Sequence, residues 1–261
     1  MTEILNDISP LWGVCPFREI QDNLIKCRAL SRLPAHPRSV IIMAFPYLLP
    51  EEYYEDSNIS KYAVPADYHD ILYARLERAA EKLREKYPGE EFVFFADNSP
   101  IPEVRAACVA GIGILGKNSL LITEKYGSFV FLGEIVTSMP LASSGGEIRG
   151  CLECGECTKA CPCGAIVNGK INKELCLSDI TQRKGQLTAG QQELIKKSGC
   201  IWGCDICQNV CPLNRTADTT DISEFINTAD GKIEAGTPVE GRAFGWRGEA
   251  VIRRNLDISK E

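Results

Sequence analysis

The sequence predicts an α+β protein built from a mixed-sheet α/β domain, a small cysteine-rich domain and a C-terminal extension. Two observations predict this division. The chain of 261 residues has 13 cysteines, and ten of them lie between Cys151 and Cys211. The stretch LASSGGEIRG just before them, with three glycines and two serines, is typical of a connecting loop. We therefore expect domains over residues 1–148 and 149–216, with residues 217–261 packing on the core as an extension.

The first domain is expected to contain both strands and helices. SVIIMAF and FVFFA are short apolar runs and are predicted to be strands. A helix is predicted over residues 67–87, because a Pro-Gly pair follows and apolar residues recur at helical spacing, namely Leu72, Leu76, Ala79, Leu83 and Tyr87. After a short helix over residues 102–110, NSLLIT and SFVFLGEIVT are expected to form a hairpin around EKYG.

Composition and charge exclude several classes of protein. Hydrophobic residues make up 44% of the chain and charged residues 25%, as in ordinary globular proteins. The net charge of −6 and the pI of about 5.2 argue against a surface built throughout to hold nucleic acid. The N-terminus MTEILNDISP lacks signal-peptide features, and the most apolar run, SVIIMAFPYLLP, is short and broken by proline. We therefore expect a cytoplasmic protein with no membrane partner.

The cysteines are the strongest chemical signal. Cytosolic thiols stay reduced, so metal ligation is a better expectation than disulfide bonds. CLECGECTKACP has the C-x2-C-x2-C-x3-C-P run of bacterial ferredoxins that hold two 4Fe-4S clusters, and GCDICQNVCP supplies three more cysteines. The pattern predicts a two-cluster, ferredoxin-like domain. Zinc, which also binds paired cysteines, is the alternative.

The spacing assigns seven of the eight cluster ligands. In such proteins the fourth cysteine of each run ligates the other cluster. The first cluster is therefore expected to bind Cys151, Cys154, Cys157 and Cys211. The second is expected to bind Cys161, Cys204 and Cys207. Its last ligand stays open among Cys163, Cys176 and Cys200.

Several segments together carry a resemblance to a known family. In chain order they are PADYHDIL, FADNSPIPEVRAA, GILGKNSLLI, SFVFLGEI, the first cysteine run, CLSDIT and WGCDICQNVCPLN. They resemble epoxyqueuosine reductase and its close relatives over nearly the whole chain. Those enzymes are similar to reductive dehalogenases in joining a cobalamin-binding domain to a double-cluster ferredoxin domain, and they remove the epoxide oxygen of epoxyqueuosine in tRNA. The resemblance implies that residues 1–148 form an α/β cobalamin-binding catalytic domain.

The resemblance also implies roles for two residues. The family's isolated cysteine lies in a segment matching LCLSDIT, so Cys176 would complete the second cluster and leave Cys163 and Cys200 as bystanders. The family's proton donor lies in a segment matching FADNSPIP, which makes Asp97 the candidate acid. We expect the end of an apolar strand to desolvate Asp97, which helps a carboxyl hold a proton. The alternative is that Asp97 is only a turn or capping residue before Pro100.

The same matching implies which positions border the cobalamin. They are Lys61, Tyr68, His69, Lys117, Asn118, Leu121 and Ser178. Simpler alternatives exist: His69 at the start of a helix can hydrogen-bond locally, and Lys117 can be an ordinary surface lysine. Apart from the resemblance, no sequence feature indicates cobalamin.

The end of the sequence departs from the family. Full-length members continue into helical repeats that help hold tRNA, and this sequence ends about where those repeats would begin. Four arginines against one glutamate make residues 242–254 locally +3: Arg242, Arg247, Arg253 and Arg254 against Glu249. This patch could contact phosphates, or it could be a solvated tail.

Together these features predict a reductase in which two 4Fe-4S clusters pass electrons singly to cobalamin and Asp97 acts as the acid. Two alternatives stay open: a related reductase of a small molecule, and a ferredoxin-like electron-transfer protein without cobalamin. In each case a reduced donor such as ferredoxin or flavodoxin would supply the electrons.

Overall fold

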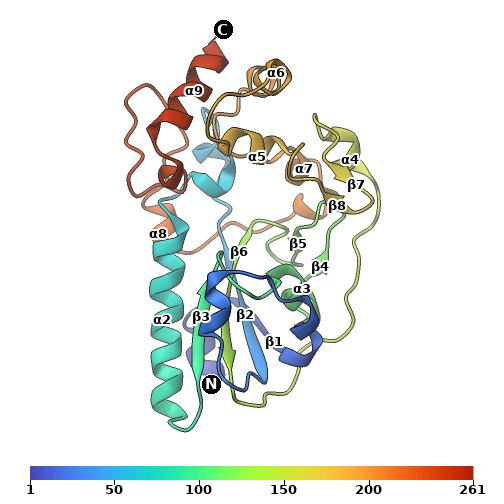
Figure 1. Ribbon diagram of the computed structural model, residues 1–261, viewed down its shortest axis with the longest axis vertical. Helices are drawn as coiled ribbons and strands as arrows, with labels where there is room; N and C mark the ends of the chain where they lie inside the picture. Colours follow the sequence, from blue (N-terminus) through green and yellow to red (C-terminus); the bar gives the residue numbers. More distant parts are fainter. Residues whose placement is uncertain (261) are drawn as a thin grey trace.

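A four-stranded sheet forms the centre of the first half of the chain (Figure 1). The computed structural model describes residues 1–260. The strands are β1 (Leu11–Pro16), β2 (Ser39–Pro46), β3 (Phe92–Ala96) and β6 (Val130–Thr137), in the order β1-β2-β6-β3. The predicted α+β class is confirmed. Every ladder in this sheet is antiparallel, however, so the sheet is not mixed in strand direction.

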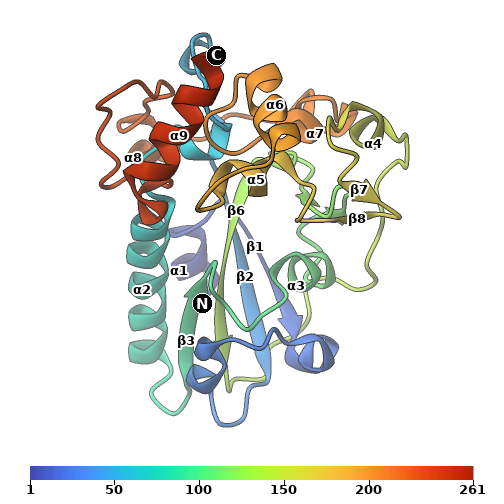
Figure 2. The ribbon, with the colours of Figure 1, turned by 45° about the horizontal axis from the view of Figure 1, so that its top comes forward.

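Helices cover both faces of the sheet, and Figure 2 shows α2 (Tyr68–Lys86) and α3 (Glu103–Val109) on opposite sides of it. The inner strand β2 is buried along its whole length, as expected when both faces are covered. Successive side chains of a strand point to opposite faces. α2 and α1 (Thr2–Asn6) pack against one set, which comprises Ile41, Met43 and Phe45. α3 packs against the other set, which comprises Val40, Ile42 and Ala44.

The predicted long helix is confirmed as α2. Its N-cap is Asp67, whose side chain accepts a hydrogen bond from the backbone N–H of His69 at 3.1 Å. The apolar positions used for the prediction face the sheet and are buried: Leu72, Leu76, Ala79 and Leu83. The helix ends just before Tyr87 and the Pro-Gly pair. Its first residues therefore lie at the end of the sheet where β3 finishes (Figure 1).

The prediction that NSLLIT and SFVFLGEIVT pair with each other around EKYG is wrong. β5 (Leu121–Ile122) pairs with β4 (Ile114–Leu115), and Thr123 and Gly127 close the turn with an isolated bridge. β6 pairs instead with β2 and β3. Six of the eight residues of β6 are buried. A strand that is apolar on both faces is better buried between two strands than held in a two-stranded hairpin.

The sequence did not predict α1, β1 or the single-turn 3-10 helices. α1 is only five residues long, and β1 contains Gly13 and Pro16, which weaken a strand signal. Gly13 is needed there because a Cβ would lie 2.7 Å from the carbonyl oxygen of Ala110. The 3-10 helices are Phe17–Glu19, Gln21–Asn23, Arg28–Arg32, Glu51–Tyr53, Lys61–Ala63, Pro212–Asn214 and Gly245–Arg247.

The cysteine-rich segment lies over the end of the sheet where β2 and β3 finish and β6 begins (Figures 1 and 2). Its elements are short: α4 (Glu156–Ala160), β7 (Ile166–Val167), β8 (Lys170–Ile171), α5 (Leu177–Gln182), α6 (Ala189–Ser198) and α7 (Ile206–Asn209). The loop before it, predicted from its glycines and serines, has no regular structure, although the Ser144 hydroxyl donates to the carbonyl of Ala110 at 2.8 Å.

The C-terminal residues include α8 (Ser223–Ile226) and α9 (Glu249–Lys260). Phe244 and Ile252 share an apolar cluster with Val64 and Trp202. The buried Asn255 amide on α9 donates to the carbonyls of Thr181 at 2.7 Å and Ile201 at 2.8 Å. Across residues 1–260, none of the helices has the length and apolar character needed to span a membrane.

Gly133 on β6 gives a test of this layer packing. A Cβ at Gly133 would lie 2.7 Å from Leu76 Cδ1 on α2 and 3.3 Å from a ring carbon of Phe45. We expect Gly133→Ala to lower the free energy of unfolding by about 1–3 kcal/mol, the usual effect of overpacking. Thermal unfolding of the anaerobic protein measures this. Gly89→Ala, where a Cβ meets nothing within 4 Å, is the control, and equal melting temperatures for the two variants would contradict the packing.

Candidate active site and cluster sites

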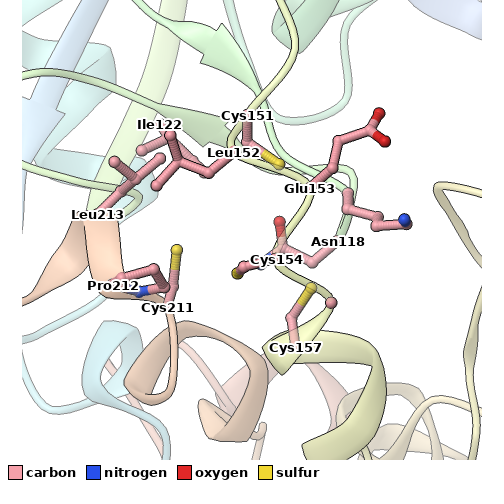
Figure 3. Close-up of a pocket in the computed structure, with 12 residues that line it drawn as sticks. Asn118, Ile122, Cys151, Leu152, Glu153, Cys154, Cys157, Cys211, Pro212 and Leu213 are labelled. Carbon is pink, nitrogen blue, oxygen red and sulfur yellow. The ribbon is translucent and has the colours of Figure 1, made fainter.

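Four thiols surround one hollow of about 360 Å³ (Figure 3). They belong to Cys151, Cys154, Cys157 and Cys211, the ligands expected for the first cluster. Figure 3 shows their sulfur atoms directed toward the space between them. Within residues 1–260 no three His, Cys, Asp or Glu side chains come close enough to hold a single ion together. The thiols thus stand around a space, as a cluster of several atoms requires.

Local backbone conformation makes this arrangement possible. Cys151 is held by its N–H, which donates to the Leu115 carbonyl at 3.0 Å. Gly155 adopts a left-handed conformation, with φ of 78°, directly before α4, so the chain reverses between Cys154 and Cys157. Cys211 arrives from α7, more than 50 residues later in the sequence.

A second hollow, of about 350 Å³, is lined by Cys161, Cys176, Cys204 and Cys207, and also by Cys163. Cys161 follows α4, and Cys176 is the N-cap of α5. Cys200 does not line this hollow. Its thiol donates to the carbonyls of Trp202 at 3.4 Å and Gly203 at 3.1 Å. The structure therefore brings Cys176 to the second set, and Cys163 lines the same hollow as a competitor.

The thiols of the second set lie in a partly apolar environment. Burial raises the pKa of Cys204 to about 12 and that of Cys207 to about 11. For Cys207 the Asn118 side chain opposes this shift. Iron binds thiolates, so cluster binding must displace these protons.

A pocket of about 600 Å³, counted to its open mouth, lies at the same end of the sheet. Its walls include Tyr68, Asp97, Glu103, Leu120, Leu121 and Phe131. The rings of Tyr68 and Phe131 stack with centroids 4.1 Å apart and planes 8° apart. Burial, followed by the charge of Asp97, raises the pKa of the Tyr68 hydroxyl, so that group stays protonated.

Asp97 lies at the mouth of this pocket rather than inside it. β3 ends at Ala96, and Asp97 then adopts a left-handed backbone conformation with φ of 55°, which aspartate tolerates. Its side chain is 61% exposed, so the expectation that the apolar strand desolvates it is wrong. The turn carries the carboxylate away from the strand. Asp97 is thus a turn residue, as the simpler alternative held, and it also lines the pocket.

His69 links Asp97 to the start of α2. Its Nε2 lies 3.1 Å from Asp97 Oδ2, and its Nδ1 lies 2.6 Å from Asp67 Oδ1. Burial by itself lowers the pKa of His69, but the hydrogen bonds and charges of the two aspartates outweigh burial and raise the pKa to about 9. The imidazole therefore holds a proton next to Asp97 at neutral pH.

The other positions expected to border cobalamin are divided among four places. Leu121 lies in the pocket with Tyr68, whereas Lys117 and Asn118 line the first thiol hollow. The Lys61 ammonium lies 3.6 Å from the centre of the Tyr54 ring. Ser178 is on α5, where its hydroxyl oxygen lies 3.5 Å from the Gln182 side-chain amide. Residues 117–122 therefore form a wall shared by the pocket and the first thiol hollow.

Sequence reasoning missed two carboxyl groups. Glu134 is fully buried on β6, and Glu103 lines the pocket at the start of α3. A signal was present in the sequence, because Glu134 interrupts the otherwise apolar strand SFVFLGEIVT.

The basic C-terminal patch is only partly at the surface. Arg242 is 12% exposed and donates to the backbone carbonyls of Ala63 and Val64, each at 3.1 Å, so its inclusion in the patch was wrong. Arg247, Arg253 and Lys184 line a groove beside α9.

Comparisons with known proteins agree with these features. Residues 28–98 match a family model described as "Epoxyqueuosine reductase QueG, DUF1730". Residues 150–214 match a model described as a 4Fe-4S double cluster binding domain. This second match covers all eight expected ligand cysteines and favours iron–sulfur clusters over the zinc alternative.

Curated relatives extend the similarity over most of the chain. An epoxyqueuosine reductase of Synechocystis is 37% identical over 207 residues, which is 77% of this chain and 71% of that protein. One of Listeria monocytogenes is 35% identical over 205 residues, which is 74% of this chain but only 54% of that protein. The chain thus spans little more than half the length of some of its relatives.

Solved structures show the same fold. An epoxyqueuosine reductase bound to an epoxyqueuosine-modified stem loop of tRNA-Tyr superposes with a TM-score of 0.81 at 25% identity, covering 99% of this chain and 79% of that one. A reductive dehalogenase studied for B12-dependent dehalogenation gives a TM-score of 0.50 at 14% identity, covering 95% of this chain and 34% of that one, which shows a likeness in fold alone. The predicted relationship is confirmed: this chain belongs to the epoxyqueuosine reductase family.

Proposed function

We propose that this protein is an iron–sulfur- and cobalamin-dependent reductase that converts epoxyqueuosine to queuosine in tRNA. The observation that carries the proposal is the pocket lined by Asp97, whose carboxylate pairs with His69, because residues 117–122 form a wall between this pocket and the first thiol hollow. A proton source and an electron source thus meet at one site. Residues 1–148 would supply the catalytic domain, residues 149–216 the cluster domain and residues 217–261 a packing extension.

The thiol sets support two 4Fe-4S clusters. We assign Cys151, Cys154, Cys157 and Cys211 to the first, and Cys161, Cys176, Cys204 and Cys207 to the second. Clusters of this kind carry one electron at a time. Cys154 is exposed, so the first cluster lies near the surface, where a reduced donor such as ferredoxin or flavodoxin could reach it.

The chemistry of the pocket fits a large flat ring. The stacked Tyr68 and Phe131 rings and the side chains of Leu120 and Leu121 offer apolar surfaces for such a ligand. When bound, cobalamin would supply the reducing metal centre. The similarity in fold to a B12-dependent dehalogenase supports this assignment.

Side chains of the protein would supply the protons that the reaction consumes. Reduction of an epoxide to an alkene takes two electrons and two protons and releases one water. The Asp97 carboxyl at the mouth of the pocket would protonate the departing oxygen, and the His69 imidazolium would position Asp97 and hold a proton beside it.

The tRNA assignment is supported by a relative that binds a modified stem loop and by the groove beside α9. Trp246 is 59% exposed next to that groove, and Arg247 lies 3.7 Å from the centre of its ring. Basic and aromatic side chains together are typical of surfaces that bind RNA. A small-molecule substrate in the same pocket is the second candidate, because the pocket itself contains no phosphate-binding cation.

The cluster assignment gives the first prediction for this site. Anaerobic protein should hold about eight iron and about eight sulfide per chain. Cys176→Ser should lose or convert one cluster, because its thiol lines the second hollow, while Cys200→Ser should keep both. Iron analysis and EPR spectra measure this, with Cys163→Ser as a further arm. Loss of a cluster in Cys163→Ser but not in Cys176→Ser would reassign the ligand, and stoichiometric zinc would contradict both sets.

Asp97→Asn tests the proposed function. Asparagine keeps the shape of the side chain but cannot donate a carboxyl proton, so turnover should fall by about 100- to 10,000-fold. Both clusters and cobalamin uptake, followed by spectroscopy, should be unchanged. Epoxyqueuosine must be offered both in tRNA and as the free nucleoside, which separates the two candidate substrates. Full activity of Asp97→Asn on either would show that the proton comes from another group.

His69 predicts a pH-dependent contribution to stability. Its pKa is raised from 6.5 to about 9 in the folded protein. The contribution should therefore be fully present below about pH 6.5 and be lost as the pH rises through about 9. The melting temperature of the wild type should exceed that of His69→Gln at pH 6.5, and the difference should shrink toward pH 10. His36→Gln, at an exposed position, is the control, and a difference that does not vary with pH would contradict the ion pair.

A further inference from the structure

Two carboxyl groups behind Asp97 have no role in the reaction described so far. Glu134 is 0% exposed, and within residues 1–260 neither of its carboxyl oxygens has a hydrogen-bond partner. Glu103 lines the pocket, and its Oε1 is likewise buried without a partner. Neither residue forms an ion pair with a cation in that part of the chain.

The sheet register places Glu134 on the α3 side. Its neighbours on the adjoining strands are Ile42 and Phe95, which both belong to the apolar cluster that packs on α3. Glu103 is the first residue of α3. Two residues after Phe95 the chain reaches Asp97, so the three carboxyl groups follow one another from the sheet interior to the pocket mouth.

A buried carboxylate without a partner is costly in free energy, and such a group takes up a proton instead. Burial, and then the neighbouring Glu103, raises the pKa of Glu134 well above its ordinary value. Burial, and then the charge of Asp97, raises the pKa of Glu103 to about 8, while the backbone N–H of Asp97 opposes it. Both groups therefore carry a proton at neutral pH.

The other ionisable groups nearby leave this conclusion unchanged. Tyr68 and Tyr73 are phenols whose pKa values are raised, Tyr68 by burial and Asp97, and Tyr73 by burial and Asp97 with a contribution from Glu134. Arg32 packs over the Phe95 ring at 4.9 Å and donates to the Phe94 carbonyl, and it makes no ion pair with the buried acids. The protonated pair is thus neutral, with Glu134 fully enclosed and Glu103 half-buried between it and the pocket.

An apolar side chain in place of Glu134 would avoid the cost of desolvating a carboxyl group. Buried groups with strongly displaced proton affinity next to a pocket are candidates for function. The proposed reaction also needs such groups, because each turnover consumes two protons and a single carboxyl group such as Asp97 can hold no more than one at a time. A large ring and a nucleoside in the pocket would cover its mouth and keep water away from Asp97.

On the basis of the proposed function, we propose that Glu103 and Glu134 form a buried proton reserve that re-protonates Asp97 within each turnover. Glu103 passes a proton to Asp97, which gives it to the epoxide oxygen as the first carbon–oxygen bond breaks. Glu134 restores Glu103, which protonates Asp97 again. Asp97 delivers this second proton as the second carbon–oxygen bond breaks, and water leaves. The two electrons come from the clusters, and solvent recharges the pair once the product has gone.

Infrared difference spectroscopy tests the protonation directly and needs no substrate. The wild type at pH 7 should show carbonyl bands of protonated carboxylic acids that shift in D2O. Glu134→Gln and Glu103→Gln should each remove one band, and the Glu103 band should disappear as the pH rises through about 8. Glu81→Gln, exposed on α2, should leave both bands in place. If no band depends on Glu103 or Glu134, both are ionised and the reserve is excluded.

Kinetics test the transfer. Glu103→Gln and Glu134→Gln keep side-chain shape and should slow epoxyqueuosine reduction by about 100-fold or more, with a larger solvent isotope effect than the wild type. Their cluster content and cobalamin uptake should be normal. Glu103→Ala should regain rate when acetic acid is added, because the truncation leaves room beside the open pocket for a small acid.

The outcomes separate this proposal from the proposed function. A wild type that reduces epoxyqueuosine while both glutamine variants keep its full rate overturns the reserve alone. A wild type that cannot reduce epoxyqueuosine overturns the proposed function and the reserve with it. A purely structural role predicts slow variants with lowered melting temperatures, no change in isotope effect and no rescue by acid, and that result also overturns the reserve.

Discussion

The pairing of β6 with both β2 and β3 is the constraint on which the site depends. This strand is buried on both faces, so it must lie inside the sheet, and its register sets where the other parts fall. It brings Phe131 under Tyr68 and puts Glu134 between Ile42 and Phe95. It also fixes the end of β3, and hence the turn that carries Asp97. The pairing of β6 thus sets the positions of Phe131 in the pocket wall, of the buried Glu134 and of Asp97 at the pocket mouth.

The cysteine-rich segment is stabilised differently from the sheet. Its helices are short, and its apolar cluster is small, so the metal clusters themselves would contribute much of its stability. The thiols are held in place by local devices, such as the left-handed Gly155 before α4 and Cys176 at the N-cap of α5. Residues 117–122 connect the thiol hollow to the pocket, because Lys117, Asn118 and Ile122 line the first and Leu120 and Leu121 line the second. In the proposed reaction, electrons and protons would meet along this short segment.

The three carboxyl groups at the pocket differ in how far they are exposed to solvent. Asp97 is largely exposed, Glu103 is half-buried, and Glu134 is fully enclosed. The only cation next to Asp97 among the described residues is the His69 imidazolium, which Asp67 also holds. Burial keeps the inner acids protonated, whereas His69 keeps the outer one hydrogen-bonded. Three carboxyl groups of one chemical type therefore lie in three different environments.

The sequence by itself determined the α+β class, the long helix α2 and the two-cluster motif, and the family resemblance predicted the roles of Asp97 and Cys176. These follow from local spacing, which a chain keeps however it folds. Only the tertiary structure decided the partners of β6, the exposure of Asp97 and the burial of Glu134. Those properties depend on residues far apart in the chain, such as Ile42, Phe95 and Glu134. A charged residue in an apolar strand is visible in the sequence, but its partners and solvent access are set by packing.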